Sequence, residues 1–409
     1  MNKGYEPEAA LMLQAFLYAY RRGKRIFLKY VERNTQMICM LEGGRKMSNY
    51  KKLCSGIFSG LLAASIICSG AGQAATRAEV AAIKVEKPTD FKYWQDNSPT
   101  KQKVVQFVEN ATNPLSKNFI PQADRVAVFD MDGTFYCETA PLYFQEMMFL
   151  HRALVEDANY QPDKKMVAFA KKIQPKIMNK TGLTPEENKT LFNYLTKAYA
   201  GMTPEEYRAY VRKFMETNED GLSNLKRGEA FYLPMVEIIS YLKNNGFVVY
   251  INSACGIDTT RELVRDVIPI SFDRIAASDF RYTSTKMGTD KAADHFYDRY
   301  QEKIVISGEP INENGKTAKI FAILNQIGKK PVLAFGNSMG DSGMLEYTLQ
   351  DNQYPSESFF VLCDDTEREL GNKAKADKLK AFAEKRGWNT ISMRDEFKTI
   401  YGDNVVRTK

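Results

Sequence analysis

The sequence predicts an α/β protein with a Rossmann-like parallel sheet, helices on both faces of that sheet, and an inserted helical cap. Apolar, β-branched runs at 125–129, 247–252, 331–335 and 359–363 are typical of buried strands. Helical patterns separate these runs, as expected for parallel strands joined by right-handed crossovers. Polar residues directly follow several of the runs, at the edge of the sheet where such proteins bind ligands.

The first run ends in two carboxylates that are one residue apart. Residues 125–129 lead into Asp130 and Asp132, which are followed by Gly133 and Thr134. Two carboxylates this close repel each other unless a cation or a shared proton neutralises them. A bound Mg²⁺, which takes oxygen ligands, would supply that neutralisation. Because a strand followed by an Asp-Gly turn gives the same pattern, the residues further along the chain decide between the two interpretations.

A long helical stretch follows this motif. Thr184-Pro-Glu-Glu and Thr203-Pro-Glu-Glu each place a Thr N-cap before Pro at the first helical position and Glu at the third. We therefore expect a separate helical cap after the first strand. The expected parts of the folded chain are an N-terminal arm over the surface with the first part of the core (75–135), the cap (136–245) and the rest of the core (246–409).

Residues 47–74 have the three-part layout of a secretory signal peptide. Two lysines precede an apolar run at 53–68, and small residues then favour cleavage after Ala74 or Ala71. The run is too short and too rich in Gly and Ser for a stable membrane anchor. We expect translation to start at Met47, the preceding residues to be a doubtful extension, and the protein to be periplasmic or secreted.

The net charge of +7 is concentrated at the start of the chain. Residues 1–46 hold nine Lys/Arg and four Asp/Glu, and residues 47–74 hold two Lys and no acid, which leaves 46 residues of each sign from residue 75 onward. A neutral folded body gives no reason to expect a nucleic acid partner. The sequence does not determine the oligomeric state.

Cysteine and histidine do not suggest a site of their own. Cys137, Cys255 and Cys363 follow the predicted cleavage site, and an odd number implies no disulfide framework. A bond between Cys137 and Cys255 is geometrically conceivable because each follows a predicted strand, but buried free thiols are the commoner outcome. The two isolated histidines, His151 and His295, are interpreted as structural.

The later runs are followed by groups suited to phosphoryl transfer. Ser253 follows the second run, Lys316 begins a predicted helix, and Asn337 and Asp341 follow the third run. The carboxyl ends of parallel strands meet at one edge of a sheet, so these side chains should converge. A carboxylate can attack phosphorus, a hydroxyl and an ammonium can hold phosphoryl oxygens, and acidic residues can hold a metal.

With these motifs, the sequence resembles the haloacid dehalogenase (HAD) superfamily of phosphohydrolases, in particular its secreted bacterial members and more remotely the phosphoserine phosphatase group. The resemblance covers roughly residues 90–400. It implies that Asp130 is the nucleophile that forms an aspartyl-phosphate. It also implies that Asp132 is the general acid and then the base, and that Ser253 binds the phosphoryl group. Since the dehalogenases proper lack the second Asp, Asp132 favours a phosphatase or a phosphotransferase.

The resemblance also implies a catalytic lysine, for which two candidates exist. Lys316 is preferred because it begins a predicted helix, whose N-terminus favours an anion. Lys319, one turn later, is the alternative. Gly133 and Thr134 are expected to bind substrate, and Glu138 could do so, as an early cap-base Glu does in the phosphoserine phosphatase group. The register of Glu138 differs by one, and a surface Glu is the other interpretation.

The resemblance implies that Mg²⁺ is the cofactor, held by Asp130, Asp132, Asn337 and Asp341, with Asp132 contributing its backbone carbonyl. Many family members have Asp where this chain has Asn337. An Asn carbonyl can still bind Mg²⁺ with one less negative charge, so we expect weaker metal affinity without loss of activity. Which of Asn337 and Asp341 contacts the ion directly stays open.

The predicted function is Mg²⁺-dependent hydrolysis of a small phosphorylated metabolite through an aspartyl-phosphate. A phosphotransferase or mutase is an alternative, because the sequence does not show which acceptor takes the phosphoryl group. A secreted, non-catalytic binding protein on the same scaffold is a second alternative. Its only support is Asn337.

Overall fold

The computed structural model describes residues 74–138, 141–155, 160–287, 294–310 and 313–408. The chain divides into two compact units, Met1–Gly70 and Ala71–Lys409, and the first unit lies outside the described residues. The predicted upstream extension and nearly all of the predicted signal peptide lie outside them as well. Within the described ranges, no helix has the length and apolar character needed to cross a membrane.

Six parallel strands form the main sheet of the described chain, in the order β3-β2-β1-β6-β7-β8. The strands are β1 (Val126–Phe129), β2 (Val248–Gly256), β3 (Ile275–Ser278), β6 (Leu333–Gly336), β7 (Glu357–Leu362) and β8 (Asn389–Ser392). The chain moves outward from β1 to β3 on one side and from β6 to β8 on the other. Ligands of open α/β sheets bind beyond the strand ends at such a reversal, which here lies between β1 and β6.

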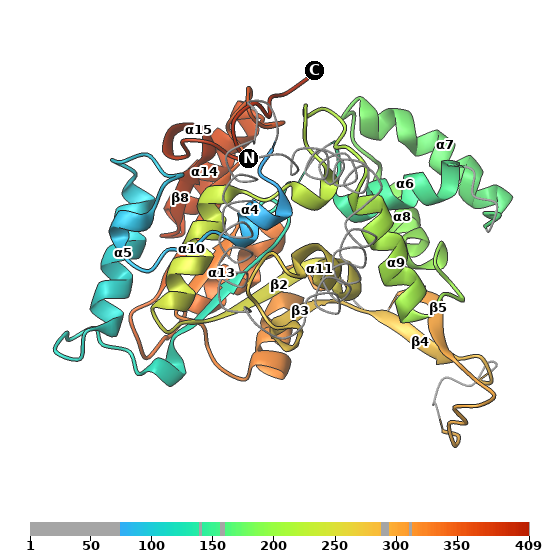
Figure 1. Ribbon diagram of the computed structural model, residues 1–409, viewed down its shortest axis with the longest axis horizontal. Coiled ribbons are helices and arrows are strands. Elements are labelled where there is room, and N and C mark those ends of the chain that lie inside the picture. Colours follow the sequence, from blue (N-terminus) through green and yellow to red (C-terminus); the bar gives the residue numbers. More distant parts are fainter. Residues whose placement is uncertain (1–73, 139–140, 156–159, 288–293, 311–312, 409) are drawn as a thin grey trace, which may run out of the picture. The chain divides into compact units, whose positions relative to one another are not determined.

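Alternate residues of β1 face opposite sides of the sheet. Val126 and Val128 belong to one hydrophobic cluster, whereas Ala127 and Phe129 belong to another. The first cluster includes residues of α13 (Ser342–Leu349) and α14 (Lys373–Lys385), and the second includes residues of α5 (Pro99–Thr112) and α10 (Leu233–Asn244). The predicted class, a parallel sheet covered by helices on both faces, is confirmed (Figure 1).

Four α-helices separate β1 from α10 in the described chain. They are α6 (Phe144–Leu154), α7 (Lys164–Met178), α8 (Pro185–Lys197) and α9 (Pro204–Met215). As predicted, Thr184 and Thr203 cap α8 and α9, each with a Glu at the third position completing a capping box. Because α10 packs against β2, it belongs to the sheet layers, so the helical insertion ends before α10 and not at residue 245.

A two-stranded antiparallel ribbon joins the core to the helical insertion. Its strands are β4 (Phe280–Ser284) and β5 (Ile304–Pro310). Ile306 accepts a hydrogen bond from Gly201 N at 2.8 Å and donates from its own N–H to Met202 O at 2.8 Å. The segment between β3 and α12 (Ala318–Ala322) therefore contacts the insertion at the start of α9 (Figure 1).

The arm expected over the surface is part of the core. Val80, Val85 and Trp94 are fully buried, and the indole N–H of Trp94 donates to Pro234 O at 2.8 Å. The carboxylate of Glu237 accepts the neighbouring backbone N–H groups of residues 92 and 93 at 2.7 and 3.1 Å. These contacts attach the arm to α10.

Candidate active site

Asp130 lies directly beyond β1, where the chain turns sharply. Its backbone N–H donates to Phe335 O at 2.9 Å, and its carboxylate accepts from Thr134 Oγ1 at 3.4 Å. Gly133 has a φ of +80°, and a Cβ there would lie 1.9 Å from Nδ2 of Asn337. Glycine is required for this close approach, which brings the motif after β1 against the motif after β6. Gly133 and Thr134 thus position Asp130.

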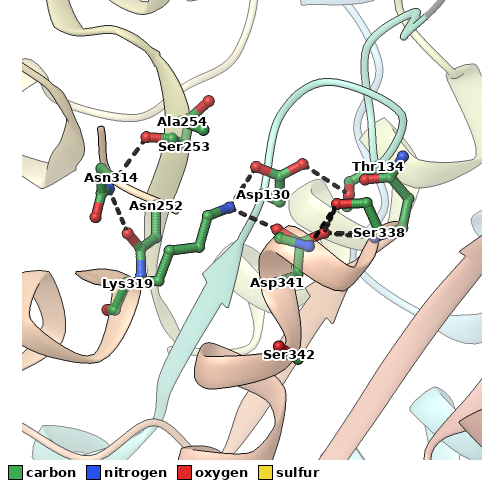
Figure 2. A network of polar contacts seen from close by, with 12 residues as sticks. Asp130, Thr134, Asn252, Ser253, Ala254, Asn314, Lys319, Ser338, Asp341 and Ser342 are labelled. Atoms are coloured by element: carbon green, nitrogen blue, oxygen red, sulfur yellow. Dashed lines mark hydrogen bonds and ion pairs between the residues drawn. The ribbon is translucent and has the colours of Figure 1, made fainter. Parts of the chain in front are cut away.

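The side chain of Lys319 lies between two carboxylates (Figure 2). Its Nζ donates to Oδ1 of Asp130 and to Oδ1 of Asp341, both at 2.6 Å, and the lysine is 1% exposed. Burial lowers the pKa of Lys319, but the two carboxylates outweigh burial and raise it, so the ammonium stays charged. Burial and the neighbouring Asp341 raise the pKa of Asp130 to about 7, against the opposing effect of Lys319.

The structure places Lys319, not Lys316, at the predicted lysine position. The helix α12 begins at Ala318, so Lys316 precedes the helix, with a φ of +55° and a backbone N–H that donates to Gly340 O at 2.6 Å. Its exposed side chain contributes to the cavity wall described below. The preference for Lys316 is corrected accordingly, because the helix begins two residues later than the sequence suggested.

Two buried asparagines, which the sequence interpretation missed, hold Lys319 in place. Asn252, at the end of β2, donates from Nδ2 to Lys319 O at 3.0 Å. Asn314 donates from its own Nδ2 to Asn252 Oδ1 at 2.8 Å and to Ser253 O at 3.0 Å (Figure 2). A polar Asn at the end of an apolar run was visible in the sequence, whereas nothing in it paired residues 252 and 314.

The loop after β6 orients Asp341 towards Lys319. Oδ2 of Asp341 accepts from the backbone N–H groups of Asn337 and Ser338 at 3.0 and 2.9 Å. This arrangement caps the short helix η6 (Met339–Asp341) and leaves Oδ1 for the lysine. Asn337 and Asp341 are both buried, and both contribute to the cavity wall.

The donor set at this edge of the sheet suits Mg²⁺. The four predicted ligands, Asp130, Asp132, Asn337 and Asp341, all contribute to the cavity wall and offer carboxylate, amide and backbone oxygens. Among the described residues, no group of three or more His, Cys, Asp or Glu is placed to hold a metal, so a site here would depend on the amide and backbone oxygens as well. Mg²⁺ commonly uses one or two carboxylates and takes its other ligands from water and substrate phosphate. Burial is the main cause of the raised pKa of Asp130 and the charge of Asp341 adds to it, so a cation beside these carboxylates would be favoured.

Asp132 has the environment of a proton donor. Its Oδ1 is buried and has no hydrogen-bond partner within the described structure. Burial, followed by the charges of Asp130 and Glu146, raises the pKa of Asp132 well above its usual value. A carboxyl group with a raised pKa holds its proton more tightly and can donate it to a leaving oxygen.

Ser253 and Glu138 lie close to these residues but are not part of the cavity wall. Ser253 is fully buried, and its Oγ accepts from Cys255 N at 3.1 Å. Glu138 is buried, and its Oε1 accepts from the hydroxyl of Tyr143 at 3.2 Å. Glu138 is therefore neither a surface residue nor part of the cavity wall, to which its partner Tyr143 belongs.

A cavity of ≈ 360 Å³ lies over the carboxylates. The site residues in its wall are Asp130, Asp132, Lys316, Lys319, Asn337 and Asp341. Seven other wall residues come from the helical insertion and from β4, namely Tyr143, Gln145, Glu146, Phe192, Leu195, Thr196 and Phe280. The sequence carried no signal for this second group, because its members reach the cavity from separate elements.

Of the three described cysteines, Cys255 contributes to the cavity wall, whereas Cys137 and Cys363 do not. Cys137, Cys255 and Cys363 are free, so the conceivable bond between Cys137 and Cys255 is not formed. The side chain of His151 contacts the hydroxyl of Tyr210 at 2.8 Å, and that of His295 contacts Glu302 at 2.8 Å. Neither histidine belongs to the cavity wall.

No protein-family model and no curated protein matches the chain. The chain is similar to a solved structure of a functionally unknown protein from Anaerococcus prevotii DSM 20548, with 12% identity, 72% of this chain and 91% of that chain covered, and a TM-score of 0.42. It is also similar to a phosphoserine phosphohydrolase-like protein from Francisella tularensis subsp. tularensis SCHU S4 (17% identity; 62% and 92% covered; TM-score 0.34). Cytosolic 5'-nucleotidase IIIB bound to cytidine is a third such structure (11% identity; 73% and 86% covered; TM-score 0.40). At these identities and TM-scores, the likenesses assign neither a substrate nor a reaction to this chain.

Proposed function

We propose that this protein is a phosphomonoesterase of the HAD type that acts on a small phosphorylated substrate through an aspartyl-phosphate. One observation carries the proposal: a buried lysine joins Asp130 to Asp341, next to an Asp132 whose carboxyl oxygen has no partner. These groups lie beyond β1 and line one cavity, whose ≈ 360 Å³ suits a small substrate. Such an arrangement provides a nucleophile, a proton donor and a fixed positive charge.

In the first half-reaction, a carboxylate oxygen of Asp130 attacks phosphorus. The bond between phosphorus and the ester oxygen breaks, and Asp132 gives its proton to the departing alkoxide. The ammonium of Lys319 holds Asp130 in place and stabilises negative charge on the phosphoryl oxygens. The products of this step are a free alcohol and a phosphoryl group on Asp130.

In the second half-reaction, water enters the cavity and is deprotonated by the carboxylate of Asp132. The water oxygen attacks phosphorus, the bond to Asp130 breaks, and inorganic phosphate leaves. Both carboxyl groups return to their starting states. Asp132 thus acts as acid and then as base, which suits a carboxyl group whose pKa is raised well above its usual value.

We further propose that Mg²⁺ is the cofactor, held by Asp130, Asp341, Asn337 and the backbone carbonyl of Asp132. When bound, Mg²⁺ would neutralise charge on the phosphoryl group and on the carboxylates.

The test is a phosphatase assay of the purified protein with p-nitrophenyl phosphate, with and without EDTA, beside Asp130→Asn. We expect turnover that EDTA removes and that Asp130→Asn lowers by at least about 10³-fold, since a carboxamide is a poor nucleophile. Turnover that survives this substitution would refute the mechanism, and turnover that survives EDTA would refute Mg²⁺ dependence. Release of nitrophenol only with an added alcohol acceptor would indicate a phosphotransferase. Absence of turnover on any phosphoester would favour a binding protein.

We also propose that the protein is exported. The support is the layout of residues 47–74, with a positive region, an apolar run and small residues before Ala75. N-terminal sequencing of the native protein should yield a start at Ala75 or Gly72. A mature protein that retains residues 1–46 would refute this proposal.

A further inference from the structure

The wall that α6 contributes to the cavity contains an unpaired acid. Glu146 lines the cavity, and its Oε2 is buried without a hydrogen-bond partner in the described structure. Burial raises the pKa of Glu146 to about 8, and Glu313, another wall residue, adds to this effect. A buried carboxyl group left without a partner is costly, so a ligand that supplies a donor or a cation would be favoured here.

The ionisable residues in the described wall around Glu146 are mostly acidic. Besides the catalytic carboxylates, the wall holds Asp279 and Glu313, whereas its cations are Lys316 and Lys319. Lys319 already binds two carboxylates, which leaves the exposed Lys316. A positively charged group would be attracted into this part of the cavity, and a second anionic group on the substrate would be repelled.

Apolar and aromatic side chains complete the same wall. Phe192 and Leu195 come from α8, and Phe280 comes from β4. Tyr143, just before α6, lies with them in the cavity wall. Aromatic rings attract cations, and the apolar surface can accept the carbon atoms that surround a substituted nitrogen.

We infer that the substrate is an aminoalkyl phosphate, whose alcohol carries a positively charged nitrogen that binds against Glu146. This inference rests on the proposed phosphomonoesterase function and adds the class of leaving group. The ammonium favours the ionised form of Glu146 and supplies the partner that its buried Oε2 lacks, while the phosphoryl group binds at Asp130 and Lys319. A neutral alcohol of the same size would leave Glu146 unpaired, and a substrate with an additional carboxylate would place that anion beside Glu146 and Glu313.

The experiment compares matched substrates and variants. Phosphoethanolamine and phosphocholine are measured against their neutral counterparts, 2-hydroxyethyl phosphate and 3,3-dimethylbutyl phosphate, and against phosphoserine, with p-nitrophenyl phosphate as the general test of turnover. Glu146→Gln keeps the side-chain shape and removes the charge. Glu313→Gln, on an exposed residue of the same wall, serves if Glu146→Gln does not fold. Glu186→Gln, on the exposed side of α8 and outside the cavity wall, is the matched control.

For the wild type, we expect kcat/KM for at least one cationic substrate to exceed that of its neutral counterpart by about tenfold or more, as for a charge-assisted contact. Glu146→Gln should bring this ratio close to one, mainly by raising KM for the cationic substrate. Glu313→Gln should lower the ratio, and Glu186→Gln should leave it as in the wild type. Equal or better use of the neutral substrates, or a preference for phosphoserine, would overturn the inference of an aminoalkyl phosphate substrate. Turnover of p-nitrophenyl phosphate in the same experiment would still support the phosphomonoesterase function. Absence of turnover on every phosphoester would overturn both.

Discussion

Replacing Lys319 with methionine removes the ammonium while keeping most of the side-chain volume. The lysine is 1% exposed, and its Nζ lies 2.6 Å from an oxygen of Asp130 and from one of Asp341. Breaking a buried ion pair by removing one partner costs about 3–5 kcal/mol, because it leaves a buried charge uncompensated. Asp130, with a pKa near 7, can take up a proton and relieve part of this cost. We therefore expect the free energy of unfolding to fall by about 3 kcal/mol at neutral pH.

This prediction is measured by urea unfolding together with turnover of p-nitrophenyl phosphate. Loss of a fixed charge from the reacting groups should lower kcat by roughly 10²- to 10³-fold. Lys316→Met is the matched control, because Lys316 is exposed and precedes the helix that carries Lys319. The control should change the free energy of unfolding by less than about 0.5 kcal/mol and kcat by less than about tenfold. If Lys319→Met kept both stability and activity, or if the control lost as much, the assignment of Lys319 would be refuted.

Two further changes test other parts of the structure. Gly133→Ala should lower the free energy of unfolding by at least about 1–2 kcal/mol, because a side chain is strained at this positive φ. The added Cβ would also displace Asn337, so both the urea midpoint and turnover should fall. Unchanged values would contradict the role of Gly133. Hydrogen bonds from Lys176, the backbone N–H of Thr184 and Lys172 lower the pKa of Glu187 to about 2. Since the folded pKa is depressed, the stabilisation is present above the unfolded pKa of about 4.3 and is lost as pH falls towards 2. The gap in melting temperature between wild type and Glu187→Gln should therefore shrink between pH 6 and pH 3, and a gap independent of pH would rule this out.

The sheet and its active edge were predictable because their signals are local. The run that became β1 is apolar and β-branched, and it ends at Asp130, so both the strand and its carboxylate could be read from adjacent residues. The caps of α8 and α9 were equally clear, since Thr184 and Thr203 precede Pro and Glu at fixed positions. The edge strand β8 is mostly polar and only partly buried, so it lacked such an apolar run and was missed.

The predictions that were wrong concern residues whose position depends on tertiary contacts. The helical pattern allowed a start at Lys316, but the chain adopts a positive φ there and begins α12 at Ala318, which turns Lys319 inward. The arm around Trp94 looks polar in sequence, yet it is buried against α10. Glu146 reaches the cavity only because α6 is folded over the strand ends, an arrangement with no trace in sequence spacing.

The most direct test of the central proposal is to trap the phosphorylated residue. Asp132→Asn should slow breakdown of the intermediate, because the base that activates water is lost. After acid quenching during turnover of p-nitrophenyl phosphate, mass spectrometry of the peptides should find one phosphoryl group on Asp130, and Asp130→Asn should abolish it. Turnover with a phosphoryl group on another residue, or with none on Asp130 at any time of quenching, would contradict the proposed mechanism.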